Sequence, residues 1–190
     1  MSRKVAVVTG YAGFIGSTFT RKLLEKGYYV FCIDKFTHVS DGLQAQRNNQ
    51  DFNDRMHWLR QDIREIDSLP ECDVIFNLAA ESDVDISNQD SSKVITSNID
   101  GVRNLLNIIN SRILIRADKP LFFQVSTDEV YGDIDQGSFD ESAPLNPSNP
   151  YSATKAAADL LVKSWARTYG LEYIIARPSN NYGPYQYPEK

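Results

Sequence analysis

The feature that most constrains the fold is a glycine-rich turn between a short apolar run and a helix. Residues 4–9 are mostly Val and Ala, typical of a buried strand, and they lead into Gly10-Tyr11-Ala12-Gly13-Phe14-Ile15-Gly16. A helical pattern then continues to about Lys26, with Gly27 as its stop. A turn this tight favours residues without a Cβ, and it lets a pyrophosphate approach the backbone N–H groups at the helix start. The pattern predicts a dinucleotide site; the alternative is a plain strand-to-helix turn with chance glycines.

Apolar runs and helical stretches alternate along the rest of the chain. We expect strands at 28–33, 56–59, 73–78, 121–125 and 171–176, and helices at 91–112 and 151–169. The polar segment 35–55 is interpreted as a loop with room for one short helix, and 132–150, rich in Gly, Ser, Asn and Pro, as a loop. This alternation predicts an α/β fold with a doubly wound parallel sheet, covered by helices on both faces.

An acidic residue follows the second expected strand. Asp34 lies near the usual distance of about 20 residues beyond the glycines. Its carboxylate can accept hydrogen bonds from ribose hydroxyls and would repel a 2′-phosphate, which favours NAD over NADP. The neighbouring Lys35 weakens that exclusion slightly. After the third strand, Asp62 and Ile63 could flank an adenine, and a helix N-cap at Asp62 is an equal alternative.

Composition and charge exclude several classes of protein. The chain has 190 residues and a net charge of −5, which argues against a general nucleic-acid binder, although a local site can still bind an anion. No apolar run approaches the length of a membrane span, and no signal-peptide pattern precedes the first strand. Cys32 and Cys72 are expected as buried thiols in a cytoplasmic protein. His38 and His57 stand apart without cysteine partners, so we expect no metal site.

Groups able to hold or move a proton are concentrated in two places. The strand at 121–125 delivers Thr127, Asp128 and Glu129 to the carboxyl end of the sheet, where ligands of such folds bind. Tyr151 and Lys155 share one face of the helix that follows the polar loop. A phenol with a pKa near 10 is a poor base at neutral pH, but a nearby ammonium and a cationic nicotinamide ring would favour the phenolate. Alternatively, the first set starts a helix and the second is a surface pair.

Taken together, these motifs resemble the extended short-chain dehydrogenase/reductases. Besides the glycine turn, they are Leu78-Ala79-Ala80-Glu81-Ser82, Ser126-Thr127-Asp128-Glu129-Val130-Tyr131-Gly132, Tyr151-Ser152-Ala153-Thr154-Lys155 and Ser179-Asn180-Asn181-Tyr182-Gly183-Pro184-Tyr185 with Pro188-Glu189-Lys190. Within that group the chain is most similar to the dTDP-glucose 4,6-dehydratases, and the Thr-Asp-Glu triplet is the specific part. The resemblance covers essentially all 190 residues.

The resemblance implies a reaction and a division of labour. Tyr151, with Lys155 and Thr127, would deprotonate the glucosyl O4 while NAD accepts the C4 hydride. Glu129 would then act as base at C5 and Asp128 as acid to the departing 6-hydroxyl, before hydride returns to C6. Epimerases and decarboxylases of the group generally have other residues in place of Asp128 and Glu129. A UDP-sugar epimerase or decarboxylase, and a silent NAD-binding fragment, remain as alternatives.

The resemblance also implies the remaining contacts. Residues 1–177 would form the NAD-binding domain with the catalytic residues, and 178–190 the start of a smaller substrate domain that is largely absent. Expected NAD contacts are Gly10, Gly13, Phe14, Ile15, Gly16, Asp34, Lys35, Phe36, Thr37, Asp62, Ile63, Leu78, Ala79, Ala80, Glu81, Ser97, Tyr151, Lys155 and Asn181. Expected substrate contacts are Ser82, Thr127, Asn180 and Lys190.

Two further expectations concern a departure and an assembly. Asp83 and Ile86 stand where relatives typically have His and Arg, which puts local substrate or dimer contacts in doubt. The relatives dimerise through two helices per subunit, so we expect a homodimer. Its candidate contacts are Leu105, Leu106, Leu160, Leu161 and Trp165.

Overall fold

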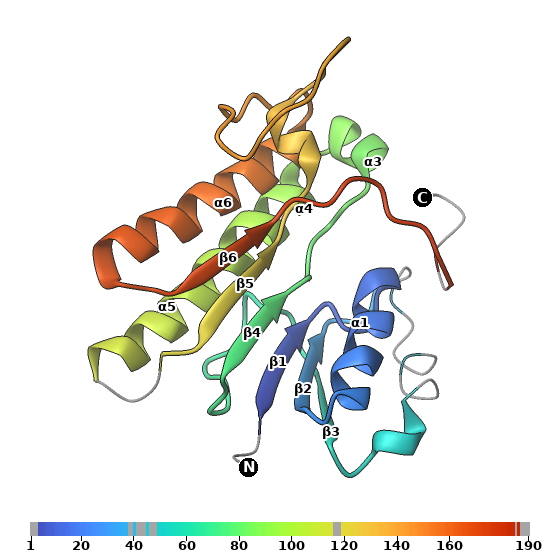
Figure 1. Ribbon diagram of the computed structural model, residues 1–190, viewed down its shortest axis with the longest axis vertical. Helices are drawn as coiled ribbons and strands as arrows, with labels where there is room; N and C mark the ends of the chain where they lie inside the picture. The colour runs from blue at the N-terminus through green and yellow to red at the C-terminus, as the bar shows by residue number, and fades with distance from the viewer. Residues whose placement is uncertain are drawn as a thin grey trace.

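Six parallel strands form one sheet in the order β3-β2-β1-β4-β5-β6 (Figure 1). The computed structural model describes residues 4–37, 40, 45, 49–115, 119–184 and 186. The strands are β1 Val5–Thr9, β2 Tyr29–Asp34, β3 Met56–Arg60, β4 Val74–Asn77, β5 Leu121–Val125 and β6 Tyr173–Ala176. Each expected strand is present within two residues of its predicted bounds, and the doubly wound parallel sheet is confirmed.

Helices cover both faces of the sheet. The helix α1 Phe14–Glu25 lies on one face, and α5 Gly101–Leu114 and α6 Pro150–Tyr169 lie on the other (Figure 1). Short helical segments are η1 Gln50–Phe52, α3 Val84–Gln89, α4 Ser92–Ile95, η2 Thr96–Asp100 and η3 Asp128–Tyr131. In the described part of 35–55, where room for one short helix was expected, Ala45 is helical and η1 follows.

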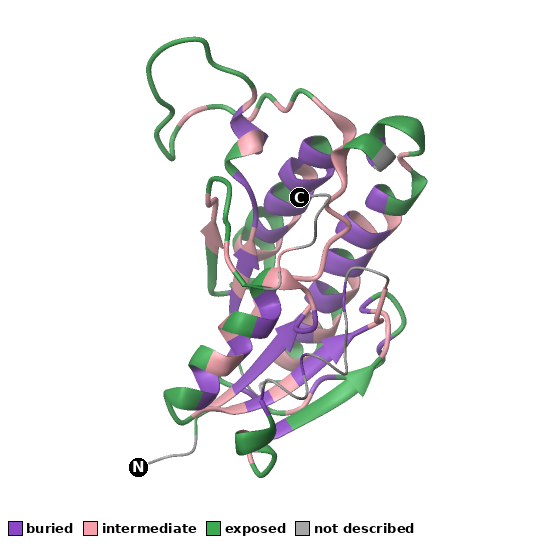
Figure 2. Ribbon diagram, turned by 90° about the vertical axis from the view of Figure 1, so that its right-hand side faces the viewer, coloured by how far each residue is buried: buried purple, intermediate pink, exposed green. Residues whose placement is uncertain are grey.

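Two hydrophobic layers sandwich the sheet, because its strands bury both faces. On β1, Val7 joins the layer beneath α5 and α6, whereas Ala6 and Val8 join the layer beneath α1. Figure 2 shows the central strands buried and an exposed edge, in keeping with β3, where all residues after Met56 are exposed. Cys32 and Cys72 are free and buried, as expected.

The helix predicted at 91–112 is not continuous. It divides into α4, the π-helical turn η2 and α5, and α3 precedes it without a prediction from the sequence. A close approach lies at the junction, because a Cβ on Gly101 would meet the Ile63 side chain at 2.5 Å. A π turn shifts the side chains that follow it around the helix axis, and such turns are frequent at functional sites. Ser97, an expected NAD contact, lies in η2.

The strand order reverses at β1, whose neighbours are β2 on one side and β4 on the other. In open α/β sheets, ligands bind beyond the carboxyl ends of the strands at such a point. The segment after β6 crosses this end of the sheet toward α1 (Figure 1). A Cβ on Gly183 would lie 3.7 Å from the Phe14 ring, so the segment reaches the glycine turn.

Candidate active site

A cavity of about 610 Å³ opens beyond the carboxyl ends of the strands, between the glycine turn and α6. Most of the residues expected to bind cofactor or substrate line it. They are Gly10, Gly13, Phe14, Ile15, Gly16, Asp34, Lys35, Thr37, Asp62, Ile63, Leu78, Ala79, Ala80, Glu81, Ser82, Ser97, Thr127, Glu129, Tyr151, Lys155, Asn180 and Asn181. Phe36 and Asp128 are not among the lining residues, and Lys190 lies outside the described part of the chain.

Backbone approaches backbone closely at the glycine turn. Gly10 has φ 70°, and a Cβ there would lie 2.7 Å from the Ala79 nitrogen. A Cβ on Gly16 would overlap the Gly10 carbonyl oxygen. Gly13 is the N-cap of α1 and offers its first turn no side-chain acceptor, and that turn carries no acidic residue. The start of α1 therefore keeps its partial positive charge, because no carboxylate in its first turn neutralises it. Such a helix start favours the binding of a phosphate.

Asp34 is fixed at the end of β2 by three donors. Its Oδ2 accepts from the Ala12 N–H at 3.1 Å, and its Oδ1 accepts from the Phe36 N–H at 2.8 Å and the Ser40 hydroxyl at 3.0 Å. Burial raises the pKa of this carboxyl, and the three hydrogen bonds and Lys35 oppose the rise. Phe36 has φ 56°, so the chain turns sharply after the carboxylate. The bond to Ala12 holds Asp34 against the glycine turn.

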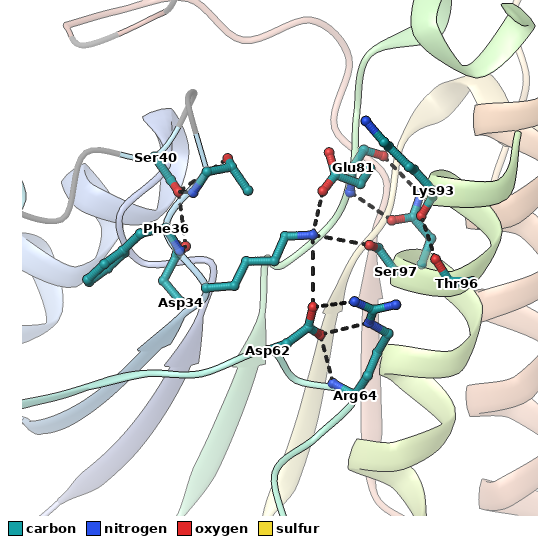
Figure 3. Close-up of polar contacts among 12 residues, drawn as sticks. Asp34, Phe36, Ser40, Asp62, Arg64, Glu81, Lys93, Thr96 and Ser97 are labelled. Carbon is teal, nitrogen blue, oxygen red and sulfur yellow. Dashed lines mark hydrogen bonds and ion pairs between the residues drawn. The ribbon is translucent and has the colours of Figure 1, made fainter. Parts of the chain in front are cut away.

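The Lys35 ammonium points away from Asp34 into a cluster of other acceptors. It lies 2.6 Å from Glu81 Oε1, 3.4 Å from Ser97 Oγ and 4.0 Å from Asp62 Oδ2. Figure 3 shows Glu81, Ser97 and Asp62 converging there, with Asp34 on the far side. Arg64 binds both oxygens of Asp62. Lys35 therefore joins the loops that follow β2, β3 and β4.

No helix begins at Asp62, so the helix N-cap alternative is wrong, and the adenine contact stays a prediction. The Oδ1 of Asp62 accepts from the Arg64 backbone N–H at 3.0 Å, so it caps a turn, and Asp62 also lines the cavity. The largest contribution to the pKa of Asp62 is burial, which raises it. The hydrogen bonds from Arg64 and the charges of Arg64 and Lys35 outweigh that effect, and the net pKa is lowered.

The expected acid–base triplet forms the short helix η3. Thr127 is buried and caps it, because its hydroxyl accepts from the Glu129 N–H at 3.3 Å. Glu129 Oε2 accepts from the Asn149 side-chain amide at 3.3 Å. Asp128 is exposed, and its N–H donates to the Pro178 carbonyl at 3.2 Å. The helix-start alternative for the triplet therefore holds structurally, and Thr127 and Glu129 still reach the cavity.

Strong end signals define α6, which carries Tyr151 and Lys155. Asn149 and Ser152 form a reciprocal capping box, Pro150 occupies the first turn, and Gly170 ends the helix with φ 72°. Asn149 was not singled out from the sequence. It joins the start of α6 to Glu129, and its position directly before a proline and an apolar helix was the signal for a cap.

Tyr151 and Lys155 lie on the buried face of α6, so the surface-pair alternative is wrong. The Lys155 ammonium donates to the Val125 carbonyl at 2.6 Å, and burial lowers the pKa of Lys155 to about 8. Burial, followed by the charges of Glu129 and Asp128, raises the pKa of Tyr151. This is the reverse of the shift that a phenolate base needs. The physical reason is that desolvation and two carboxylates outweigh any effect of Lys155 in the chain alone.

Buried polar side chains beneath the cavity were also missed from the sequence. The Thr9 hydroxyl donates to Asn77 at 2.6 Å, and the Asn77 amide donates to Gln124 at 2.8 Å, which joins β1, β4 and β5. Asn98 binds both backbone groups of Glu81. Polar residues inside apolar runs were the available signal, because a buried polar group requires a partner.

Other residues line the cavity without having been predicted. They are Ser40, Gln61, Asp83, Lys93, Val94, Val125, Ser126, Pro178, Ser179 and Gln186. Asp83 is the residue that departs from the pattern of the relatives, so the departure lies in the cavity wall. Nothing is described of the Ile86 side chain.

The described residues contain neither a candidate metal site nor a membrane-spanning helix. No group of three or more His, Cys, Asp or Glu side chains there could hold a metal ion. None of the helices in the described ranges is long and apolar enough to cross a membrane.

Known proteins share both the sequence and the fold. The low-salt glycan biosynthesis protein Agl12 of Haloferax volcanii is 43% identical over 97% of this chain and 59% of its own length. DesIV, a dTDP-glucose 4,6-dehydratase from Streptomyces venezuelae solved with NAD and TYD bound, is 40% identical with a TM-score of 0.87, covering 98% of this chain and 59% of its own. A UDP-glucuronic acid 4-epimerase from Bacillus cereus, solved with UDP-glucuronic acid and NAD, is 31% identical with the same TM-score, covering 98% of this chain and 60% of its own.

These relatives extend well beyond the matched region, since the chain spans about three fifths of their length. A family model described as GDP-mannose 4,6 dehydratase matches residues 7–190, which includes the glycine turn, the triplet and the Tyr151–Lys155 pair. The chain belongs to the GDP-mannose 4,6 dehydratase family.

Proposed function

We propose that the chain is the NAD-binding and catalytic part of a nucleotide-sugar 4,6-dehydratase that acts on dTDP-glucose. The observation that carries the proposal is that Thr127 and Glu129 line the same cavity as the glycine turn and the Tyr151–Lys155 pair. Relatives named as dTDP-glucose 4,6-dehydratases, at about 40% identity, support the substrate. Residues 1–177 would be the NAD-binding domain and 178–190 the start of the substrate region.

The chemistry of the cavity fits NAD. A pyrophosphate suits the glycine turn, where Gly10 and Gly16 leave no room for a Cβ and the start of α1 lacks a carboxylate. Asp34 suits the adenosine ribose, and its charge disfavours a 2′-phosphate. Lys35 could neutralise such a phosphate, but Glu81 and Asp62 hold its ammonium. When bound, NAD supplies the acceptor and later the donor of a hydride.

The residues of the chain move the protons. Tyr151 Oη takes the proton from the hydroxyl at C4 of the sugar, and Thr127 hydrogen-bonds the same oxygen. The carboxylate of Glu129 takes the proton at C5, next to the ketone at C4, and Asp128 gives a proton to the oxygen that leaves C6. Two neighbouring carboxyls in opposite protonation states suit such an elimination. Asp128 is exposed and accepts from the hydroxyl of Thr127, which lines the cavity, at 3.3 Å, so it can exchange protons with solvent.

The electrostatics of the site tie this proton transfer to NAD binding. Burial, followed by the charges of Glu129 and Asp128, raises the pKa of Tyr151, so the phenol stays protonated at neutral pH in the chain alone. A positively charged nicotinamide ring acts in the opposite direction. We expect NAD⁺, and not NADH, to lower the pKa of Tyr151, which an ultraviolet titration of the phenolate would measure against the Tyr151→Phe background.

The proposed reaction is tested by measuring product formation and by stopping the reaction after the oxidation at C4. The chain, and a version extended to the length of the relatives, would be given NAD and dTDP-glucose, and the 4-keto product would be read by its absorbance in alkali. Glu129→Gln should retain oxidation at C4 but block elimination, because an amide cannot take the C5 proton. NADH should then accumulate with a 4-keto sugar. Normal turnover by this variant, or substrate binding without NADH, would refute the assignment of Glu129.

A 4-epimerase is the alternative that the B. cereus neighbour supports. The two reactions differ in their products, since an epimerase returns a sugar that keeps its 6-oxygen. Mass spectrometry of the sugar nucleotide separates them by the mass of one water. A sugar that keeps its mass and changes only at C4 would favour the epimerase.

We also propose that the chain forms a homodimer through α5 and α6. Leu160 is 56% exposed on α6, and Leu161 and Trp165 are half-buried against the core. The expectation that Leu105 and Leu106 contribute is wrong, because both are fully buried under their own sheet. A monomeric mass by light scattering at tens of micromolar would count against the dimer.

A further inference from the structure

A buried ion pair lies behind the Tyr151–Lys155 pair, and the scheme above gives it no role. Asp159 is fully buried on α6, one helical turn beyond Lys155. Its Oδ2 accepts from Arg177 Nε at 2.9 Å, and the Arg177 side chain is 11% exposed. Apolar residues often stabilise a fold as well as a buried ion pair does, so stability alone is a weak reason for this one.

Arg177 also reaches the helix that carries the acid–base triplet. Its Nη1 donates to the Tyr131 hydroxyl at 2.6 Å, and its guanidinium carbon lies 5.0 Å from the centre of the Tyr131 ring. Tyr131 is the last residue of η3. Two backbone bonds run alongside, from the Ser126 N–H to the Ala176 carbonyl at 2.7 Å and from the Asp128 N–H to Pro178. Arg177 therefore connects η3 with α6 from the end of β6.

The charges of this cluster are balanced around Lys155. Burial lowers the pKa of Lys155 to about 8, and the carboxylate of Asp159 opposes that fall. Burial raises the pKa of Asp159, whereas Arg177, Ser126 and Lys155 lower it. Several titratable or charged groups lie on the elements packed around Lys155. They include Tyr151 and Asp159 on α6, Asp128, Glu129 and Tyr131 on η3, Lys93 on α4, which lines the same cavity, and Arg177 after β6. When Asp159 is ionised, its carboxylate is the negative charge that stabilises both the Lys155 ammonium and the Arg177 guanidinium.

We propose that Asp159 and Arg177 are positioning residues: Asp159 keeps Lys155 in its ammonium form, and Arg177 orients Asp159 and, through Tyr131, the triplet on η3. Without Asp159, two cations would share a buried site, and Lys155 is the one that can lose its proton. Without Arg177, η3 and α6 would lose their shared anchor. The consequence for catalysis rests on the proposed function, but the effect on Lys155 does not.

The test measures Lys155 directly, by an NMR titration of the chain with carbon-13 in its lysine side chains. Lys155→Met assigns the resonance. In Asp159→Asn, which keeps the shape and removes the charge, the pKa of Lys155 should fall below its value of about 8, because the opposite charge one helical turn away is lost. Asp159→Glu should recover most of that shift. Tyr131→Phe is the matched control, because it removes one hydroxyl of the network without altering charge, and it should leave the Lys155 titration in place.

Several outcomes would overturn the proposal. They are an unmoved Lys155 titration in Asp159→Asn, the same shift in Tyr131→Phe, and no recovery in Asp159→Glu. A further test uses the unmutated chain and so does not depend on the folding of a variant. The NMR signal of the Asp159 carboxyl carbon must show that Asp159 is ionised at pH 7. A protonated Asp159 there refutes the proposal.

The pH dependence of activity distinguishes a failure of this proposal from a failure of the proposed function. In the active enzyme, the rate of C4 oxidation should fall on the alkaline side as Lys155 loses its proton, and Asp159→Asn should move that fall to lower pH. Purely structural damage would lower the rate without moving the profile. If no nucleotide sugar reduces NAD, the proposed function fails, and the NMR titration still decides the role of Asp159.

Discussion

The two halves of the cavity differ in how their charges are compensated. In the cofactor half (the glycine turn, Asp34 and Lys35), the chain itself supplies partners: three donors for Asp34, and three acceptors around the Lys35 ammonium. Burial raises the pKa of Asp34 as well, but three hydrogen bonds and Lys35 oppose that rise. In the catalytic half (η3, Tyr151 and Lys155), burial raises the pKa of Tyr151 with Glu129 and Asp128 adding to the rise, and it lowers that of Lys155 with only Asp159 opposing the fall.

This difference suggests a division between binding and reactivity. Groups with their partners in place form a prearranged binding surface, which reduces the ordering that binding requires. Groups whose pKa values are shifted by burial respond strongly to any charge that enters their site. Substitutions in the cofactor half should therefore alter affinity, and substitutions in the catalytic half should alter rate.

The largest effect is expected from Tyr151→Phe. Loss of a positioned acid–base group costs about 10²- to 10⁴-fold in rate, so C4 oxidation should nearly stop, and no NADH should appear with substrate. Tyr151 is also an expected NAD contact, but the substitution removes one hydroxyl only, so NAD affinity should fall far less than the rate, which fluorescence titration would check. Tyr169→Phe, at an exposed position near the end of the same helix, is the control. A large loss of NAD affinity in Tyr151→Phe would break the proposed division.

In the cofactor half, Asp34→Ala should act on affinity alone. Hydrogen bonds to a charged group contribute about 1.5–3 kcal/mol, so NAD should bind about 10- to 100-fold more weakly, and the preference over NADP should shrink. Titration of both cofactors measures this. Equal affinities for the two in the unmutated chain, with neither altered by the substitution, would remove Asp34 from the site.

The cofactor half was also the part best predicted from the sequence. Gly10, Gly16 and Asp34 act through backbone geometry and position after a strand, which short motifs encode. The strands were predictable because apolar and β-branched residues dominate their runs, even where single polar residues interrupt them. The cap by Asn149 had a local signal that was missed. The division at η2, the bond of Asn149 to Glu129 and the contacts of Arg177 were not predictable, since they depend on elements far apart in the chain. The upward pKa shift of Tyr151 was missed for the same reason, because it arises from burial and from carboxylates on another element.

A smaller effect concerns stability and pH. The pKa of Lys155 is about 8 in the fold, below its ordinary value of 10.5. Above pH 8 the unfolded chain therefore binds more protons than the folded chain, so Lys155 makes stability rise with pH. Above about pH 9, Cys32 and Tyr151 act in the opposite direction, because burial raises their pKa values. Between pH 8 and 9 we expect Lys155 to contribute a rise of about 1 kcal/mol in unfolding free energy. Urea unfolding should show this contribution as the difference from Lys155→Met, and equal slopes would contradict it.

The smallest effect should come from releasing Lys35. Glu81→Gln removes the carboxylate that lies 2.6 Å from the Lys35 ammonium. The Lys35 side chain, which is 34% exposed, can then turn toward a 2′-phosphate. Because partly exposed ion pairs contribute about 0.2–1 kcal/mol, NADP affinity should rise only about two- to threefold. Adding Lys35→Met to Glu81→Gln should cancel that gain. Glu25→Gln, which breaks exposed ion pairs on α1, controls for net charge. A gain that survives Lys35→Met would show that Asp34 alone excludes NADP and that the Lys35 cluster serves only to join its three loops.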